Sequence, residues 1–262
     1  ISSCVNVVLD IFFIAGLGMG VGSAALATAI SQFVSALLCM VHLLRVEEEY
    51  RLIIQNGVPS GFQNSVIAIA NVFVQSNINA FGKMAMAGCG SYSKIEGFAF
   101  LPVTCFTMAL TTFVSQNLGA KQYDRAKKGA KFGVLCSIAI AELIGIIIYA
   151  AAPILITAFN RDPDVVHYGV MQARIIALFY CLLAFSHCIA AVLRGSGNAS
   201  VPMIVMLCDW CLFRVSYITV AVRILPDIRV IFWAYPLTWS ISSVIFLYLF
   251  LRGKWMYGFE KS

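Results

Sequence analysis

The first apolar stretch of the chain, ISSCVNVVLDIFFIAG, carries an amide and a carboxylate at helical spacing. Asn6 and Asp10 are four residues apart, so on a helix both side chains project from the same face. An acid inside a membrane-spanning helix is energetically expensive and therefore marks a candidate functional site. A structural alternative stays open, in which Asp10 only caps a hydrogen bond between two helices.

A second set of polar side chains lies in the apolar stretch of residues 57–81. Asn71, Gln75 and Asn79 follow one another at intervals of four residues and form one polar stripe, and Gln63 precedes them. Such a stripe either joins helices through hydrogen bonds or forms the wall of a water-filled cavity. The sequence leaves both interpretations open.

Later apolar stretches contain an acid, an arginine and a lone histidine. Asp209 and Arg214 are five residues apart, so they need not pair with each other on one helix. We hypothesise that they form a buried ion network with Glu142. His187 is the only histidine of its stretch. Such a residue usually packs against its neighbours, and the alternative is a proton relay.

The elements that carry these residues follow from composition. The chain has 262 residues, of which 61% are hydrophobic and 11% charged, with a mean hydropathy of +0.89. A soluble domain carries about 25% charged residues, so lipid must cover much of this surface. A membrane-spanning helix needs roughly 20 apolar residues. The sequence therefore predicts an all-α, polytopic transmembrane bundle. About eight spans are expected, at residues 1–16, 23–44, 57–81, 95–111, 132–152, 170–193, 203–222 and 231–251.

The stretch TTFVSQNLGAKQYDRAKKGAK, residues 111–131, is a basic segment between two apolar spans. Its basic residues are Lys121, Arg125, Lys127, Lys128 and Lys131, against the single acid Asp124. Because loops rich in Lys and Arg resist translocation, we expect this loop and the C-terminus on the cytoplasmic side of the cell membrane. The net charge of +6 gathers at span ends rather than on one face, which argues against a nucleic-acid partner.

The first two spans resemble the last two. VNVVLD, ALATAIS and HLLR recur as DWCLFR, YPLTWSIS and LFLR, and in this register Thr28 falls on Thr238 and Asp10 on Arg214. Repeated helix sets are typical of transporters that rock one half against the other. We expect residues 1–45 to be the last two helices of a first lobe, 46–56 a cytoplasmic connector, and 57–262 a complete six-helix second lobe.

The stretches NVVLD, AALATAIS, GVPSGFQNS, TTFVSQNLGAKQYDRA and LRGSGNASVP follow one another in this order. Together they closely resemble the multidrug and toxic compound extrusion (MATE) family, in its bacterial branch, over essentially the whole chain. The resemblance implies twelve helices in two six-helix lobes that face a central cavity. This chain would then hold helices five to twelve of a protein that is monomeric at full length.

The resemblance also implies a function, an antiporter that exports organic, often cationic, small molecules through the lipid membrane by alternating access. Entry of Na⁺ or H⁺ drives this export. In several members an Asp of helix one forms the cation site with an Asn, an Asp and a Thr from helices five and six. Asn6, Asp10 and Thr28 match that second group in type and spacing. Their carboxylate, amide and hydroxyl oxygens suit a hard cation such as Na⁺, and a partly desolvated carboxylate also exchanges protons.

The second lobe departs from some members, which carry acids in helices seven and ten. Here residues 57–81 and 170–193 contain no acid, which argues against a second-lobe cation site of that type. We expect polar and ionisable residues of this lobe to line the substrate cavity. They are Gln63, Asn71, Gln75, Asn79, His187, Asp209 and Arg214.

Two other functions were compared with export. A lipid-linked saccharide flippase shares the two-lobe architecture, but it needs a large cationic groove, and only Arg174 and Arg214 lie within spans. An intramembrane enzyme needs a catalytic constellation, whereas no H-E-x-x-H occurs and no carboxylate pair lies in one span at helical spacing. We therefore expect neither an enzyme nor a cofactor other than the coupling ion.

Overall fold

The structure is a computed structural model that describes residues 2–18, 22–46, 50–252 and 255–256, and every regular element in these ranges is helical. This confirms the all-α fold. The elements are α1 (Ser2–Asp10), the π-helix η1 (Ile11–Gly16), α2 (Gly22–Val46), α3 (Tyr50–Asn79), α4 (Lys83–Gly119), α5 (Tyr123–Thr157), α6 (Pro163–Ile176), the 3₁₀-helix η2 (Ala177–Phe179), α7 (Tyr180–Gly195), α8 (Ser200–Met206), the π-helix η3 (Leu207–Phe213), α9 (Arg214–Ile224) and α10 (Ile228–Leu251).

Each of the eight expected spans corresponds to a helix or to consecutive helices. In the described residues, six segments are long and apolar enough to cross a membrane: Gly22–Val41, Lys83–Gly119, Tyr123–Thr157, Pro163–Gly195, Ser200–Ile224 and Ile228–Leu251. The first span is a shorter apolar helix, Ser3–Ile14, and α3 contains the polar stripe. Large apolar side chains such as Phe98 and Ile154 face outward, as expected of a surface covered by lipid.

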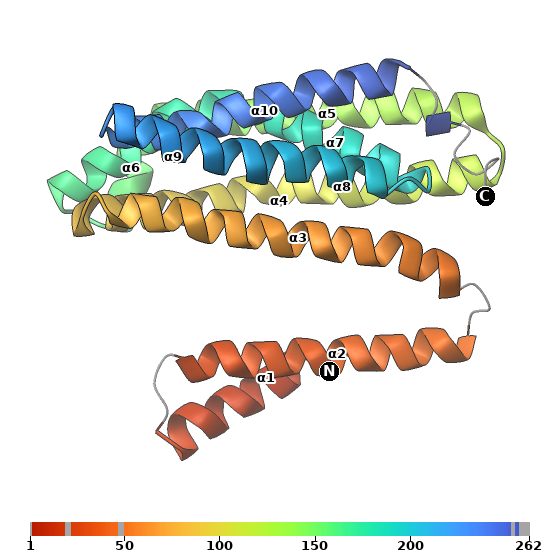
Figure 1. The fold of residues 1–262 in the computed structure, drawn as a ribbon, viewed down its shortest axis with the longest axis horizontal. Coiled ribbons are helices and arrows are strands. Elements are labelled where there is room, and N and C mark those ends of the chain that lie inside the picture. Colours follow the sequence, from red (N-terminus) through yellow and green to blue (C-terminus); the bar gives the residue numbers. More distant parts are fainter. Residues whose placement is uncertain (1, 19–21, 47–49, 253–254, 257–262) are drawn as a thin grey trace. The chain divides into compact units, whose positions relative to one another are not determined.

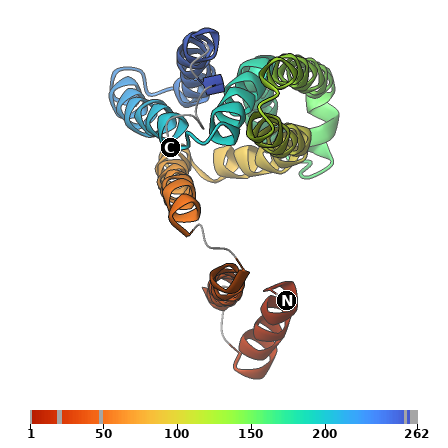
Figure 2. The ribbon, with the colours of Figure 1, turned by 90° about the vertical axis from the view of Figure 1, so that its right-hand side faces the viewer.

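Contacts divide the chain into two units, Ile1–Gln55 and Asn56–Ser262. In the first unit α1 packs against α2. In the second, α4 contacts α5, α6 and α7, and α7 contacts α10, so these helices run side by side as a bundle (Figure 1, Figure 2). The assignment of the two units to two lobes stays a prediction.

Two of the expected connections are largely helical. Because α2 continues to Val46 and α3 begins at Tyr50, most of the expected connector 46–56 belongs to a helix, and residues 47–49 lie outside the described ranges. The basic segment 111–131 forms the ends of α4 and α5, joined by a short turn at Lys121 with φ 56°. These helices have 37 and 35 residues, about 55 and 52 Å. Both are therefore longer than a hydrocarbon core of roughly 30 Å.

Glycines allow the backbones of the second unit to approach closely. A Cβ atom at Gly88 of α4 would lie 2.6 Å from the carbonyl oxygen of Val165, and one at Gly145 of α5 would clash with that of Ala177. Small residues at such crossings allow dense packing where lipid provides no hydrophobic driving force between helices. A buried apolar cluster that includes Tyr92, Ile176, Tyr180 and Trp239 forms one part of the core of this unit.

Candidate functional site

In the first unit the structure brings Asn6 of α1 and Thr28 of α2 together. Asn6 Nδ2 donates a hydrogen bond to Thr28 Oγ1 at 3.3 Å, and the Thr28 hydroxyl donates to the carbonyl oxygen of Ala24 at 2.9 Å. Asp10, one helical turn from Asn6, is half-buried. Its Oδ1 atom is buried without a hydrogen-bond partner among the described residues. An amide, a hydroxyl and a carboxylate oxygen are thus available at this helix pair.

The backbone beside Asp10 is irregular. The α-helix ends at Asp10, and the π-helix η1 (Ile11–Gly16) follows directly. A π-turn widens the helix and is frequent at functional sites, because it changes the direction of side chains relative to a regular helix. The apolar run of residues 11–16 alone does not predict this change of helix type.

In the second unit Arg214, the first residue of α9, is buried, with 2% of its surface exposed. Its Nη2 atom donates a hydrogen bond to Thr238 Oγ1 at 2.9 Å. The guanidinium carbon lies 5.0 Å from the centroid of the Trp210 ring and 4.7 Å from that of Tyr235. Aromatic faces attract cations through their quadrupoles. A hydroxyl oxygen and two aromatic faces therefore hold this buried charge.

In the described ranges no carboxylate forms an ion pair with Arg214. The ion pair found there is exposed and joins Arg229 Nε to Asp227 Oδ2 at 3.9 Å. Asp209 is buried, and neither of its carboxylate oxygens has a hydrogen-bond partner there. The carboxylates that act electrostatically on Arg214 are those of Asp209 and Glu96. Glu142 instead accepts a hydrogen bond from the backbone N–H of Cys181 at 3.2 Å, so it is not part of the hypothesised network.

A cavity of about 320 Å³ adjoins Arg214 in the second unit. Its lining residues come from α3, α4, α7, η3, α9 and α10: Asn71, Ser93, Glu96, Gly97, Phe100, Leu183, Trp210, Arg214, Tyr235 and Trp239. The indole Nε1 atoms of Trp210 and Trp239 and the Nε atom of Arg214 are buried without hydrogen-bond partners in the described part. The cavity wall thus combines one acid, one base and several aromatic faces.

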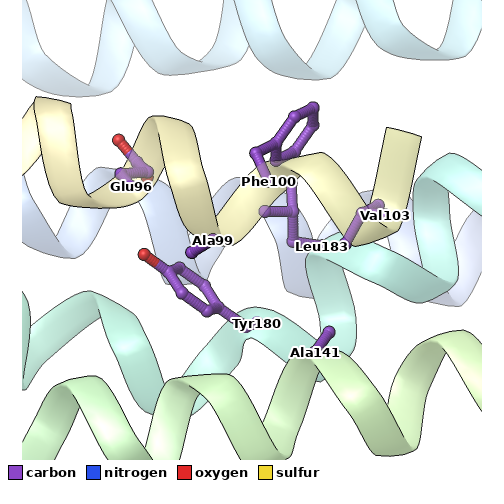
Figure 3. Close-up of a pocket in the computed structure, with 7 residues that line it drawn as sticks. All are labelled: Glu96, Ala99, Phe100, Val103, Ala141, Tyr180 and Leu183. Carbon is purple, nitrogen blue, oxygen red and sulfur yellow. The ribbon is translucent and has the colours of Figure 1, made fainter. Parts of the chain in front are cut away.

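Glu96 is an acidic residue of this cavity wall that is absent from the site residues predicted from the sequence. A span expected from about residue 95 leaves Glu96 at the outer end, but α4 begins at Lys83, so Glu96 lies several turns inside the helix. It also lines a small enclosed void of about 10 Å³ with Tyr180 and Ala141 (Figure 3). An acidic residue in an apolar stretch is the sequence signal for this site. The position of Glu96 within the helix follows only from the structure, in which α4 continues without a break through GCGSYS, residues 88–93.

The amides of α3 divide between two roles. Asn71 lines the cavity beside Arg214. Gln63 is buried, donates to the sulfur of Met206 at 2.7 Å, and lines a second cavity of about 340 Å³. Gln75 donates to Asn79 at 2.9 Å, and both side chains are exposed on the unit. Asn71 therefore forms part of a cavity wall, whereas the Gln75–Asn79 hydrogen bond lies within α3 and joins no two helices.

His187 of α7 lies between the two cavities. Its ring makes edge contacts with Phe100 at 5.1 Å and Trp210 at 5.2 Å between centroids. It lines the 340 Å³ cavity together with Gln63 and Arg194, and its Nε2 atom is buried without a hydrogen-bond partner in the described residues. The histidine is therefore both a packing residue and a wall residue of a polar cavity.

The chain was compared with known proteins. The family model MatE matches residues 59–219. The probable multidrug resistance protein NorM of Thermotoga maritima is 27% identical over 97% of this chain and 59% of its own length. The probable multidrug resistance protein YoeA of Bacillus subtilis is 23% identical over 79% of this chain and 49% of its own length.

A solved structure agrees with this result at the level of the fold. A multidrug resistance MATE family transporter of the MOP superfamily in its outward-facing conformation superposes with a TM-score of 0.76 at 21% identity, over 100% of this chain and 62% of that one. The chain therefore spans less than two thirds of the length of these relatives. Since the family model covers more than half of the sequence, the chain belongs to the MatE family of multidrug and toxic compound extrusion transporters.

Proposed function

We propose that the full-length protein is a cation-coupled antiporter that exports organic, often cationic, small molecules across the cell membrane by alternating access. The observation that carries this proposal is the cluster of polar side chains in the first unit, formed by Asn6, Asp10 and Thr28. The Asn6–Thr28 hydrogen bond lies one turn from the unpartnered Oδ1 atom of Asp10. Family membership and the names of the bacterial relatives support transport rather than catalysis.

Asp10 is the group that exchanges the coupling ion, Na⁺ or H⁺. A charged carboxylate within a membrane span is unstable unless a cation, a proton or a hydrogen-bond donor compensates it. Asn6 and Thr28 supply neutral oxygens that complete part of the coordination of a hard cation. Ion binding neutralises Asp10 and stabilises one of the two alternating states. By linkage, the substrate and the ion then change each other's affinity by the same factor.

The second unit contributes to the substrate pathway. Asn71 and Arg214 line one cavity, and Gln63 and His187 line the other. Gln75 and Asn79 extend the polar surface of α3, and the buried Asp209 of η3 acts electrostatically on Arg214. We further propose that the basic turn between α4 and α5 faces the cytoplasm and that the full-length transporter acts as a monomer in lipid.

The test is efflux of a fluorescent organic cation from vesicles that contain the full-length protein, under imposed Na⁺ or pH gradients. We expect D10N to abolish gradient-driven efflux, because an amide neither ionises nor exchanges a proton. The matched control is D124N, which neutralises an exposed acid in the first turn of α5 and should leave efflux unchanged. Efflux that survives D10N would contradict the assignment of the coupling acid. Movement of a lipid-linked saccharide without gradient-dependent movement of any cation would favour a flippase instead.

A further inference from the structure

Two helix pairs, α1 with α2 in the first unit and α9 with α10 in the second, each contain a hydrogen bond to a threonine hydroxyl. When each helix of the expected repeat is aligned separately, Thr28 of α2 corresponds to Thr238 of α10, and Asp10 of α1 corresponds to Arg214 of α9. Thr28 donates to the carbonyl oxygen of Ala24 at 2.9 Å, and Thr238 donates to that of Ala234 at 3.0 Å. Both threonines therefore leave an oxygen lone pair free to accept from the partner helix.

The two threonine hydroxyl groups accept hydrogen bonds from different kinds of donor. Thr28 accepts from the neutral amide of Asn6 at 3.3 Å, with the acid Asp10 one turn away. Thr238 accepts from the guanidinium of Arg214 itself at 2.9 Å. The position that carries a negative charge in the first pair thus carries a positive charge in the second. The irregular backbone differs between the two pairs, because the π-helix η1 follows Asp10 whereas the π-helix η3 precedes Arg214.

The surroundings of Arg214 are those of a cation site. The guanidinium lies over the Trp210 and Tyr235 rings and donates a hydrogen bond to a hydroxyl oxygen, as a bound cation would contact these groups. The titratable groups that act on it from the elements packed around it are Tyr235 of α10, Asp209 and Cys211 of η3, and Glu96 of α4. These elements supply two carboxylates and Arg214 supplies the one positive charge between them, so removal of Arg214 leaves both carboxylates without a compensating charge.

We propose that Arg214 is a tethered cation that permanently occupies, in the second unit, the position at which the first unit binds its exchangeable ion. The second unit then needs no ion from solution, and each transport cycle exchanges its cation in the first unit alone. The consequence for coupling rests on the proposed function, but the tethered charge itself can be tested separately. A merely structural arginine would lose packing when replaced, without any new dependence on ions.

The test uses the purified full-length protein with Asp10 already neutralised, so that ion effects at the first site are removed. R214Q/D10N is compared with D10N and with the charge-retaining control R214K/D10N. The melting temperature is measured as NaCl rises from about 1 to about 100 mM and again as pH falls. Ionic strength is held constant by the chloride of a bulky organic cation that the efflux assay shows is not exported. We expect R214Q/D10N to gain several degrees with Na⁺ or acid, and neither control to change. A folded R214Q/D10N that responds to neither would overturn the proposal.

Failure of R214Q to fold is also informative. If the missing positive charge is the cause, a second neutralisation, E96Q or D209N, should restore the folded protein. If neither restores it, the proposal is wrong and the role of Arg214 is packing. The comparison of wild type with D10N tests the proposed function alone, because Arg214 is intact in both. A wild type that shows no ion dependence would therefore contradict the coupling role of Asp10 and leave the Arg214 result unaffected.

Discussion

Tyr92 of α4 and Tyr180 of α7 share a buried hydrogen bond, with 2.8 Å between the two hydroxyl oxygens. Tyr180 also lines the small void next to Glu96 (Figure 3). The pair joins two long helices at the level of the acid, so it holds one wall of the polar interior in position. A buried neutral hydrogen bond contributes about 1 kcal/mol, and loss of one partner leaves the other unsatisfied.

The tyrosine pair predicts a non-additive stability effect. We expect Y92F and Y180F each to lower the free energy of unfolding by about 1–2 kcal/mol, because each leaves one buried hydroxyl without its partner. The double variant should lose less than the sum, by about 0.5 kcal/mol or more. Reversible unfolding of the four proteins in detergent measures the coupling energy. Strict additivity would show that the two hydroxyl groups do not interact.

Thr238 predicts a second, charge-assisted effect. In T238V the guanidinium of Arg214 loses its hydroxyl acceptor, and a hydrogen bond to a charged group is worth about 1.5–3 kcal/mol. We therefore expect a clear fall in melting temperature. T112V is the control, because Thr112 is exposed on α4 and donates only to the carbonyl oxygen of Met108 in its own helix. Equal effects of the two substitutions would argue against a special role for the Arg214 contact.

Two glycines of α4 form a matched pair for helix packing. A Cβ atom at Gly88 meets the carbonyl oxygen of Val165 at 2.6 Å, whereas one at Gly90 meets no atom within 4 Å. We expect G88A to destabilise the protein by about 1–3 kcal/mol through overpacking. G90A should be neutral or stabilising by up to about 1 kcal/mol, since alanine favours the helix. Thermal unfolding in detergent compares them, and a stable G88A would contradict the close crossing of α4 and α6.

Thr28 provides a graded test of cation binding. T28V keeps the shape of the side chain but removes the hydroxyl oxygen, so we expect the Na⁺ concentration for half-maximal efflux to rise about tenfold, equivalent to about 1.4 kcal/mol. T28S retains the oxygen and should stay close to wild type. Ion-titrated efflux from vesicles measures both variants. If T28V and T28S behave alike, the hydroxyl does not contact the ion.

The basic turn predicts sidedness. Gln122 lies in the turn between α4 and α5, and Arg161 lies in the turn between α5 and α6, at the other end of α5; both side chains are exposed. We expect a membrane-impermeant maleimide to label R161C in intact cells, and Q122C only after permeabilisation, because Lys- and Arg-rich segments stay in the cytoplasm. The parent protein, with its own cysteines, gives the background. The reverse labelling pattern would invert the orientation.

The class of the protein and the location of its helices are predictable from the sequence because both depend on local composition. A run of apolar residues must become a helix in lipid, whatever its neighbours are, since every backbone group has to be hydrogen-bonded internally. Local composition does not show where helices continue through polar sequence. The described residues of the expected connector 46–56 and most of the basic segment 111–131 are helical. Charged residues at helix ends outside the hydrocarbon core look the same in sequence as a loop.

The sequence by itself determined an all-helical membrane protein and its family motifs, and it predicts that Asp10 pairs with Arg214 and Thr28 with Thr238 in an internal repeat. Only the tertiary structure decided that Arg214 lies between two aromatic rings and bonds Thr238, and that Glu96 rather than Glu142 is the second acid near it. The physical reason is that helical spacing assigns a side chain to a face of its own helix. The rotation and crossing of packed helices then decide which faces meet.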